Sequence, residues 1–132
     1  MPRVIKSLLF GLVLLTACGA TAPTLDQTDA QTKTASFLTE ALSDPETTYT
    51  GTSERFQSNS TLEDFQTFVD TNLKGYTDFS VTGLSYQQGV GINATKVDGD
   101  LTYSDLTSKN ASFIWSYNNA TKAWTLDALR FN

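Results

Sequence analysis

The chain has no histidine and a single cysteine, Cys18, among its 132 residues. One cysteine forms no internal disulfide, and without histidine or a second thiol it has no companions for a metal site. The same absence removes the imidazole that most often acts as a general base or activates a thiol. We therefore expect no enzymatic activity, no bound metal and no cofactor.

Basic residues are also scarce. The chain contains nine Lys and Arg against 14 Asp and Glu, for a formal net charge of −5 at pH 7. The basic residues form no cluster of the kind that binds nucleic acids or anionic headgroups. We expect no nucleic-acid partner.

The longest apolar run is short and lies close to the N-terminus. Arg3 and Lys6 precede about nine mostly apolar residues, 7–15. A membrane-spanning helix needs about 20 apolar residues. A basic start followed by a short apolar run is typical of a secretory signal instead.

This run ends in Leu15-Thr16-Ala17-Cys18, which resembles the bacterial lipobox. The resemblance implies cleavage before Cys18 and acylation of its sulfur and new amino group, so that lipid holds the protein at the cell envelope. Gly19 stands where enteric lipoproteins kept at the inner membrane have aspartate, which favours the outer membrane if the host has one. The alternative is a secreted protein cleaved after the A-x-A-like Ala20-Thr21-Ala22, directly before Pro23.

The chain therefore divides into three expected parts. Residues 1–17 are the lipoprotein signal peptide, 18–27 the lipidated cysteine with a flexible tether, and 28–132 one domain. The tether is small, polar and proline-containing, whereas the remainder has the length of a common single domain.

The first half of the domain has a helical pattern. From about residue 28 one apolar stripe recurs at 3.6-residue spacing: Ala30, Thr34, Phe37, Leu38, Ala41 and Leu42. Asp44 and Pro45 suit the N-cap and first position of a short second helix. Residues 60–73 predict another helix, with Ser60 and Glu63 at capping-box spacing and Gly75 as its C-terminal stop.

After Gly75 the period changes from 3.6 to 2. Four runs alternate, with phase slips at Gly83, between Ala94 and Val97, and between Leu126 and Leu129, as β-bulges produce. The intervening segments are rich in Asn, Asp, Gly, Ser and Thr, as hairpin turns require. The sequence predicts an α+β fold with N-terminal helices packed on a curved antiparallel sheet of about four strands.

Several motifs resemble small lipoproteins and domains of unknown function in the nuclear transport factor 2-like superfamily. They are "FLTEAL", "YTGTSERF" with Tyr49, Ser53 and Phe56, "TLEDFQTFV", and Trp124-x-Leu126 in the last strand. The resemblance implies a cone-shaped α+β fold. A cystatin-like sheet around one helix is the nearest alternative.

Aromatic side chains are the remaining candidates for core or site. Phe65, Trp115 and Trp124 occupy apolar positions of three elements, so we expect them among the most buried residues. Tyr103, Trp115 and Tyr117 are candidates to line the mouth of a cone cavity and hold an apolar or sugar-like ligand, with core packing as the alternative.

The acidic residues suggest no site. Asp98, Asp100 and Asp105 lack the order of an EF-hand loop, so we assign them to turns and strand edges. We expect a membrane-tethered envelope lipoprotein whose non-enzymatic domain contacts another envelope protein. The alternative is a small-ligand carrier or sensor.

Overall fold

The computed structural model describes residues 23–89 and 92–132. In these ranges four helices precede four strands, and none of the helices is long and apolar enough to cross a membrane. Cys18 and the lipobox lie outside the described residues. The elements are α2 (Gln27–Ser43), α3 (Pro45–Thr50), α4 (Glu54–Asn59), α5 (Leu62–Asn72), β1 (Tyr76–Gly89), β2 (Ile92–Tyr103), β3 (Ser108–Asn118) and β4 (Ala123–Phe131).

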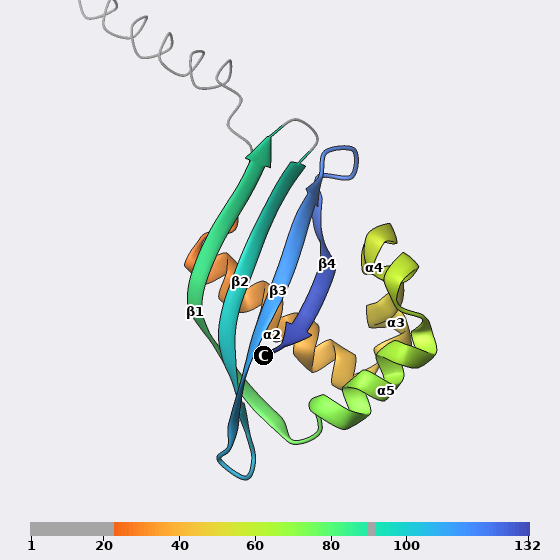
Figure 1. Ribbon diagram of the computed structural model, residues 1–132, viewed down its shortest axis with the longest axis vertical. Helices are drawn as coiled ribbons and strands as arrows, with labels where there is room; N and C mark the ends of the chain where they lie inside the picture. The colour runs from red at the N-terminus through yellow and green to blue at the C-terminus, as the bar shows by residue number, and fades with distance from the viewer. Residues whose placement is uncertain (1–22, 90–91) are drawn as a thin grey trace, which may run out of the picture.

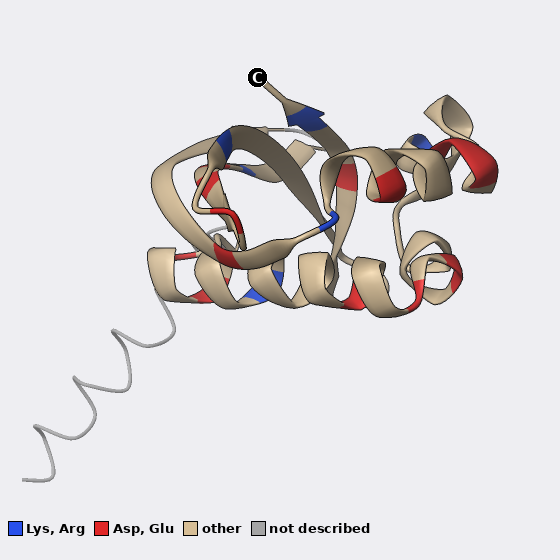
Figure 2. Cartoon of the chain, turned by 90° about the horizontal axis from the view of Figure 1, so that it is seen from below, with Lys and Arg blue, Asp and Glu red and all other residues tan. Residues whose placement is uncertain are grey.

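The strands form one antiparallel meander in the order β1-β2-β3-β4. The sheet is curved and unclosed, and Figure 2 shows it arching over α2. The three shorter helices gather beside β4 (Figure 1). The predicted α+β class, with N-terminal helices and a curved four-stranded antiparallel sheet, is confirmed.

Two of the three predicted phase slips are β-bulges. In β1 the pairing register shifts between Val81 and Gly83. In β4 it shifts at Asp127, the extra residue between Leu126 and Ala128, which pair with Trp115 and Ile114 of β3. The slip predicted in β2 is wrong, because β2 pairs with β3 without a shift. Thr95 takes the core-facing position, and its hydroxyl accepts a 3.4 Å hydrogen bond from the backbone N–H of Leu25.

Each of the two predicted helix starts has a side chain that caps it, although one lies one residue later than predicted. Asp44 caps α3 with Pro45 at its first position, as predicted. The capping box of α5 is Thr61 with Asp64, so the prediction of Ser60 with Glu63 is wrong by one residue. The reason is local: the backbone N–H of Ser60 closes α4 on the carbonyl of Phe56, so the next helix starts one residue later.

The core lies between α2 and the concave face of the sheet. Phe65 and Trp115 are 2% and 4% exposed, as predicted, whereas Trp124 is only half-buried. Trp124 lies near the β3–β4 turn and contacts Tyr117, with ring centroids 5.3 Å apart. Leu42, expected on the buried stripe of α2, is instead 37% exposed.

The packed structure begins before residue 28. Leu25, which the sequence analysis placed in the tether, is 3% exposed, and its carbonyl accepts a 3.0 Å hydrogen bond from the Tyr86 hydroxyl. Cys18 and Leu25 are seven positions apart in the sequence. At about 3.4 Å per residue, that segment reaches at most about 24 Å.

Candidate functional site

The three predicted site residues do not form one site. Trp115 lies opposite Thr95 in the β2–β3 ladder, and Tyr103 is the last residue of β2. Thr95 and Tyr103 are eight positions apart along β2, which corresponds to about 26 Å of strand. Tyr117 lies beyond Trp115, farther still from Tyr103.

Each of these side chains has a packing role. The Tyr103 hydroxyl donates to the carbonyl of Asn72 at 2.5 Å, and burial raises the pKa of Tyr103. The Trp115 indole N–H donates to the Thr34 hydroxyl at 3.1 Å. These contacts favour the core interpretation of Tyr103 and Trp115 over a ligand site.

A broad hollow along α2 does include part of Trp115. It has a volume of about 650 Å³ and also borders Phe37 and Trp124. The Lys33 ammonium lies 5.3 Å from the centre of the Trp115 ring. Because Trp115 is almost fully buried, it presents little surface to a ligand there.

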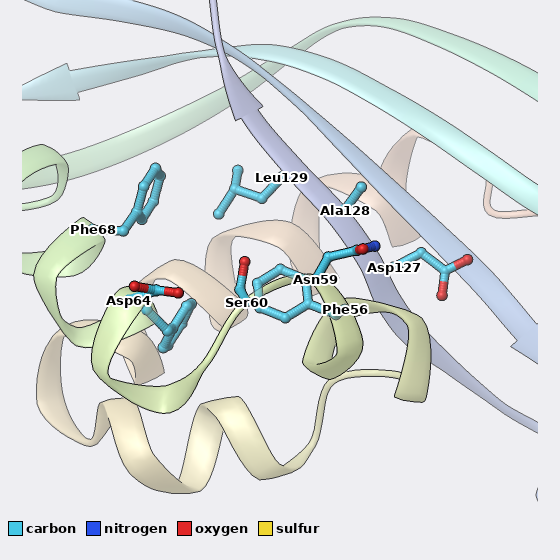
Figure 3. Close-up of a pocket in the computed structure, with 9 residues that line it drawn as sticks. Phe56, Asn59, Ser60, Asp64, Phe68, Asp127, Ala128 and Leu129 are labelled. Atoms are coloured by element: carbon cyan, nitrogen blue, oxygen red, sulfur yellow. The ribbon is translucent and has the colours of Figure 1, made fainter.

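A smaller and more apolar cavity of about 290 Å³ lies between α4, α5 and β4 (Figure 3). Its lining combines aromatic and aliphatic side chains with a few polar ones: Phe56, Asn59, Ser60, Asp64, Phe65, Phe68, Asp127, Ala128 and Leu129. We call it the α4–α5 pocket and take it as the candidate functional site.

Hydrogen bonds with β4 and α3 position the two helices of this pocket. The Ser53 hydroxyl caps α4, and the Ser53 N–H donates to the carbonyl of Leu126 at 3.0 Å, which fixes α4 against β4. The Tyr49 hydroxyl donates to the carbonyl of Ser60 at 2.6 Å, which fixes the link between α4 and α5. The pocket walls are therefore held in place by α3 and β4.

Aromatic rings form the inner wall. Phe56 and Phe65 meet edge-to-face with centroids 5.8 Å apart, and Tyr49 lies 5.9 Å from Phe65. Phe68 packs edge-to-face on Phe131 at 5.2 Å. Rings locked in this way give a rigid apolar surface, which suits an apolar group more than a charged one.

Polar groups lie around this apolar wall. The bulge in β4 turns Asp127 toward α4, where its carboxylate lies 4.0 Å from Nε of the exposed Arg55. Figure 3 shows the Asp127 carboxylate pointing away from Phe68, and the Ser60 hydroxyl pointing toward Leu129. The Asp64 carboxylate accepts the Thr61 N–H in the capping box.

The polar groups of the pocket lie apart from one another. Asp127 pairs with Arg55 and Asp64 with the backbone of Thr61, and no group of three or more potential metal ligands occurs in the described ranges.

Among the residues that line this pocket, only Phe65 was predicted from the sequence to be a core residue, Phe56 and Leu129 were noted in a family motif and at a phase slip, and the pocket was not predicted. The one sequence feature that could have indicated the pocket is the phase slip in β4, because it predicts the bulge that lies at the rim of the pocket.

Comparisons with protein-family models, with curated proteins and with solved structures found no match for this chain.

Proposed function

We propose that the chain is a bacterial envelope lipoprotein. In this proposal residues 1–17 are the signal peptide and Cys18 carries the lipid, at the outer membrane if the host has one. The proposal rests on the lipobox-like Leu15-Thr16-Ala17-Cys18 after a short apolar run. Two or more acyl chains hold a protein firmly, because each buried CH₂ contributes roughly 0.8 kcal/mol.

The position of Leu25 supports a role close to the membrane. Because Leu25 is packed into the fold, at most about 24 Å of chain separates the domain from a lipidated Cys18. A short tether raises the local concentration of any partner on the same membrane. It gives no comparable benefit for a freely diffusing substrate.

We infer that the domain is a non-enzymatic accessory module that contacts another envelope protein. The observation that carries this proposal is the close packing of buried aromatic rings under α2. Phe79 and Phe113 meet edge-to-face at 5.5 Å between α2 and the sheet, and both are at most 1% exposed. The α4–α5 pocket, open at the side of the domain, is the surface we assign to the partner, which would insert one apolar side chain.

A small-ligand carrier is the second candidate. The α4–α5 pocket, at about 290 Å³, approaches the volume of roughly 300 Å³ at which small-molecule sites begin. Its aromatic wall and the Ser60 hydroxyl are the mixture of apolar and polar groups that such sites use. The proposed cone-shaped nuclear transport factor 2-like architecture would accommodate either function.

Lipidation is tested by metabolic labelling with a fatty-acid analogue in a bacterial host. The wild type is expected to take up the label and to fractionate with membranes, and Cys18→Ala to lose both. Label that persists in Cys18→Ala would contradict the assignment of the lipid to Cys18.

The partner is tested by placing a photo-crosslinking residue at Asn59, on the pocket rim, in the full-length protein in its own envelope. Gln66, which is also exposed, lies on α5 outside the pocket and is the matched control. A protein adduct from position 59 that is absent from position 66 is the expected result. No protein adduct, with a metabolite or lipid retained on purification, would favour the carrier instead.

A further inference from the structure

The two edges of the sheet are covered to different extents. At β4 the Ser53 N–H donates to the carbonyl of Leu126, and α4 packs beside the strand. At β1 the side chain of Gln31 takes the place of a neighbouring strand. Its amide nitrogen donates to the carbonyl of Phe79, and its amide oxygen accepts the N–H of Val81 at 2.9 Å.

Beyond the bulge, no described strand pairs with the outer edge of β1 at Leu84 and Tyr86. Successive residues of an antiparallel strand direct their N–H and C=O groups to alternate edges. The carbonyl of Phe79 and the N–H of Val81 point outward to Gln31, so odd-numbered residues face the edge before the bulge. The extra residue at the bulge moves this pattern by one, so even-numbered residues face the edge after it. Leu84 and Tyr86 therefore direct their backbone groups to the outer edge, and no further strand covers it in the described part of the chain.

This edge lacks the features that usually prevent strand addition. Exposed edges are commonly protected by Lys, Pro or other charged side chains. Residues 83–89, "GLSYQQG", contain no Pro and no charged residue. Tyr86 is 47% exposed, although it is large and mostly apolar.

We propose that two copies of this chain pair antiparallel along this edge, about a two-fold axis at Ser85. In that register Leu84 of one copy lies opposite Tyr86 of the other. The backbone groups of these two residues then form four hydrogen bonds across the axis, and each Leu84 covers a Tyr86 ring. Such an interface is self-complementary, as two-fold symmetry requires.

Charge favours a second copy at this edge. The protein carries a net charge of −5, and Asp and Glu are spread along its helices (Figure 2), so most faces of two copies repel each other. The segment 83–89 is uncharged, so two copies meet there without opposing side-chain charges.

The position of the tether agrees with this pairing. The Tyr86 hydroxyl bonds to the carbonyl of Leu25, so in both copies the chain toward Cys18 leaves the fold close to the two-fold axis. Both copies could then reach one membrane although their strands run in opposite directions. This last step rests on the proposed function, whereas the pairing itself does not.

Cysteine crosslinking of the full-length protein tests the pairing. Opposed residues of antiparallel strands have Cα atoms about 4.5–5.5 Å apart, within the range of a disulfide. Ser85→Cys is expected to give a disulfide-linked dimer under mild oxidation. Ser80→Cys is the matched control, because Ser80 is an exposed serine of the same strand, five residues away.

The wild type, oxidised in parallel, reports any dimer formed through Cys18, and membrane fractionation reports lipidation separately. A Ser85→Cys dimer no stronger than that of Ser80→Cys overturns the pairing, and so does a crosslink from position 85 to a different protein. Loss of the membrane fraction alone would contradict only the lipid anchor.

A second pair of variants tests the backbone contacts. Tyr86→Pro removes an N–H that points to the outer edge, so the β1–β2 ladder is expected to stay intact. It is expected to weaken association at least tenfold by analytical ultracentrifugation. Tyr86→Phe, which loses only the hydroxyl, is expected to associate like the wild type. Equal association of the proline variant and the wild type would contradict the proposal.

Discussion

The indole N–H of Trp115 donates a 3.1 Å hydrogen bond to the hydroxyl oxygen of Thr34, and both side chains are buried. This bond joins α2 to β3 across the core. It explains how a threonine occupies a fully buried position of α2, because its hydroxyl has a partner there.

We expect Thr34→Val to lower the free energy of unfolding by about 1–3 kcal/mol, because the buried indole N–H would lose its partner. Thr34→Ser keeps the acceptor and is expected to cost about 0.8 kcal/mol for the lost methyl group. Urea denaturation measures both. In a double-mutant cycle with Trp115→Phe, additivity within about 0.5 kcal/mol would show that the bond contributes nothing.

Gly99 provides a second prediction. A Cβ atom at this position would collide with the ring of Phe79 and lie 2.5 Å from the carbonyl oxygen of Ser80. We expect Gly99→Ala to destabilise the domain by about 1–3 kcal/mol through overpacking. Gly89→Ala is the control, since nothing lies within 4 Å of its Cβ, and it is expected to change stability by less than about 0.5 kcal/mol. Equal melting temperatures for the two variants would contradict this packing.

The tip of the β2–β3 hairpin provides a third. Leu106 is 88% exposed and has a φ of 71°, in the left-handed region that disfavours residues with a Cβ. Leu106→Gly is expected to raise the free energy of unfolding by up to about 1 kcal/mol. Leu106→Ala keeps the Cβ and is expected to give no such gain. Thermal unfolding of both variants is the measurement, and a stabilised alanine variant would show that backbone strain is not the cause.

Stability at alkaline pH provides a fourth. Burial raises the pKa of Tyr103 above its usual value of about 10, so the folded state holds this proton more tightly than the unfolded chain. The stability linked to Tyr103 is present below about pH 10 and is lost as the pH rises through the folded-state pKa.

Tyr103→Phe should therefore be less stable at pH 7, by about 1 kcal/mol for the lost bond to Asn72, yet decline less between pH 9 and about 11. Urea midpoints at several pH values test this. Tyr76 serves as the comparison, because burial and the nearby Asp78 raise its pKa also. A decline as steep as that of the wild type would rule out Tyr103 as a source of the alkaline sensitivity.

The order of helices and strands could be predicted because periodicity records which face of each element is buried. The N-cap at Asp44 and the bulge near Gly83 could also be predicted, because caps and bulges depend on local sequence. The burial of Thr95 and Leu25 could not be predicted, because these two residues contact each other across 70 positions of sequence. The choice of Thr61 as the N-cap of α5 depended on how α4 ends, which the capping residues alone do not show.

The α4–α5 pocket was unpredictable for the same reason. Phe68 and Leu129 each look like core residues in their own element. Only the docking of α4 on β4 through Ser53 leaves a space between them. A cavity is a property of how elements meet, and the residue pattern of one element does not contain it.

The meander of the sheet also affects how the chain folds. Every strand pairs with its neighbour in sequence, so each hairpin closes only a short loop and the entropic cost of loop closure is small. The bond between Thr34 and Trp115, in contrast, spans 81 residues. Low contact order favours rapid folding, so we expect the hairpins to form early and α2 to dock late in the folding reaction. The N-terminal helix would then remain unpacked until the strands that follow it in the chain have formed.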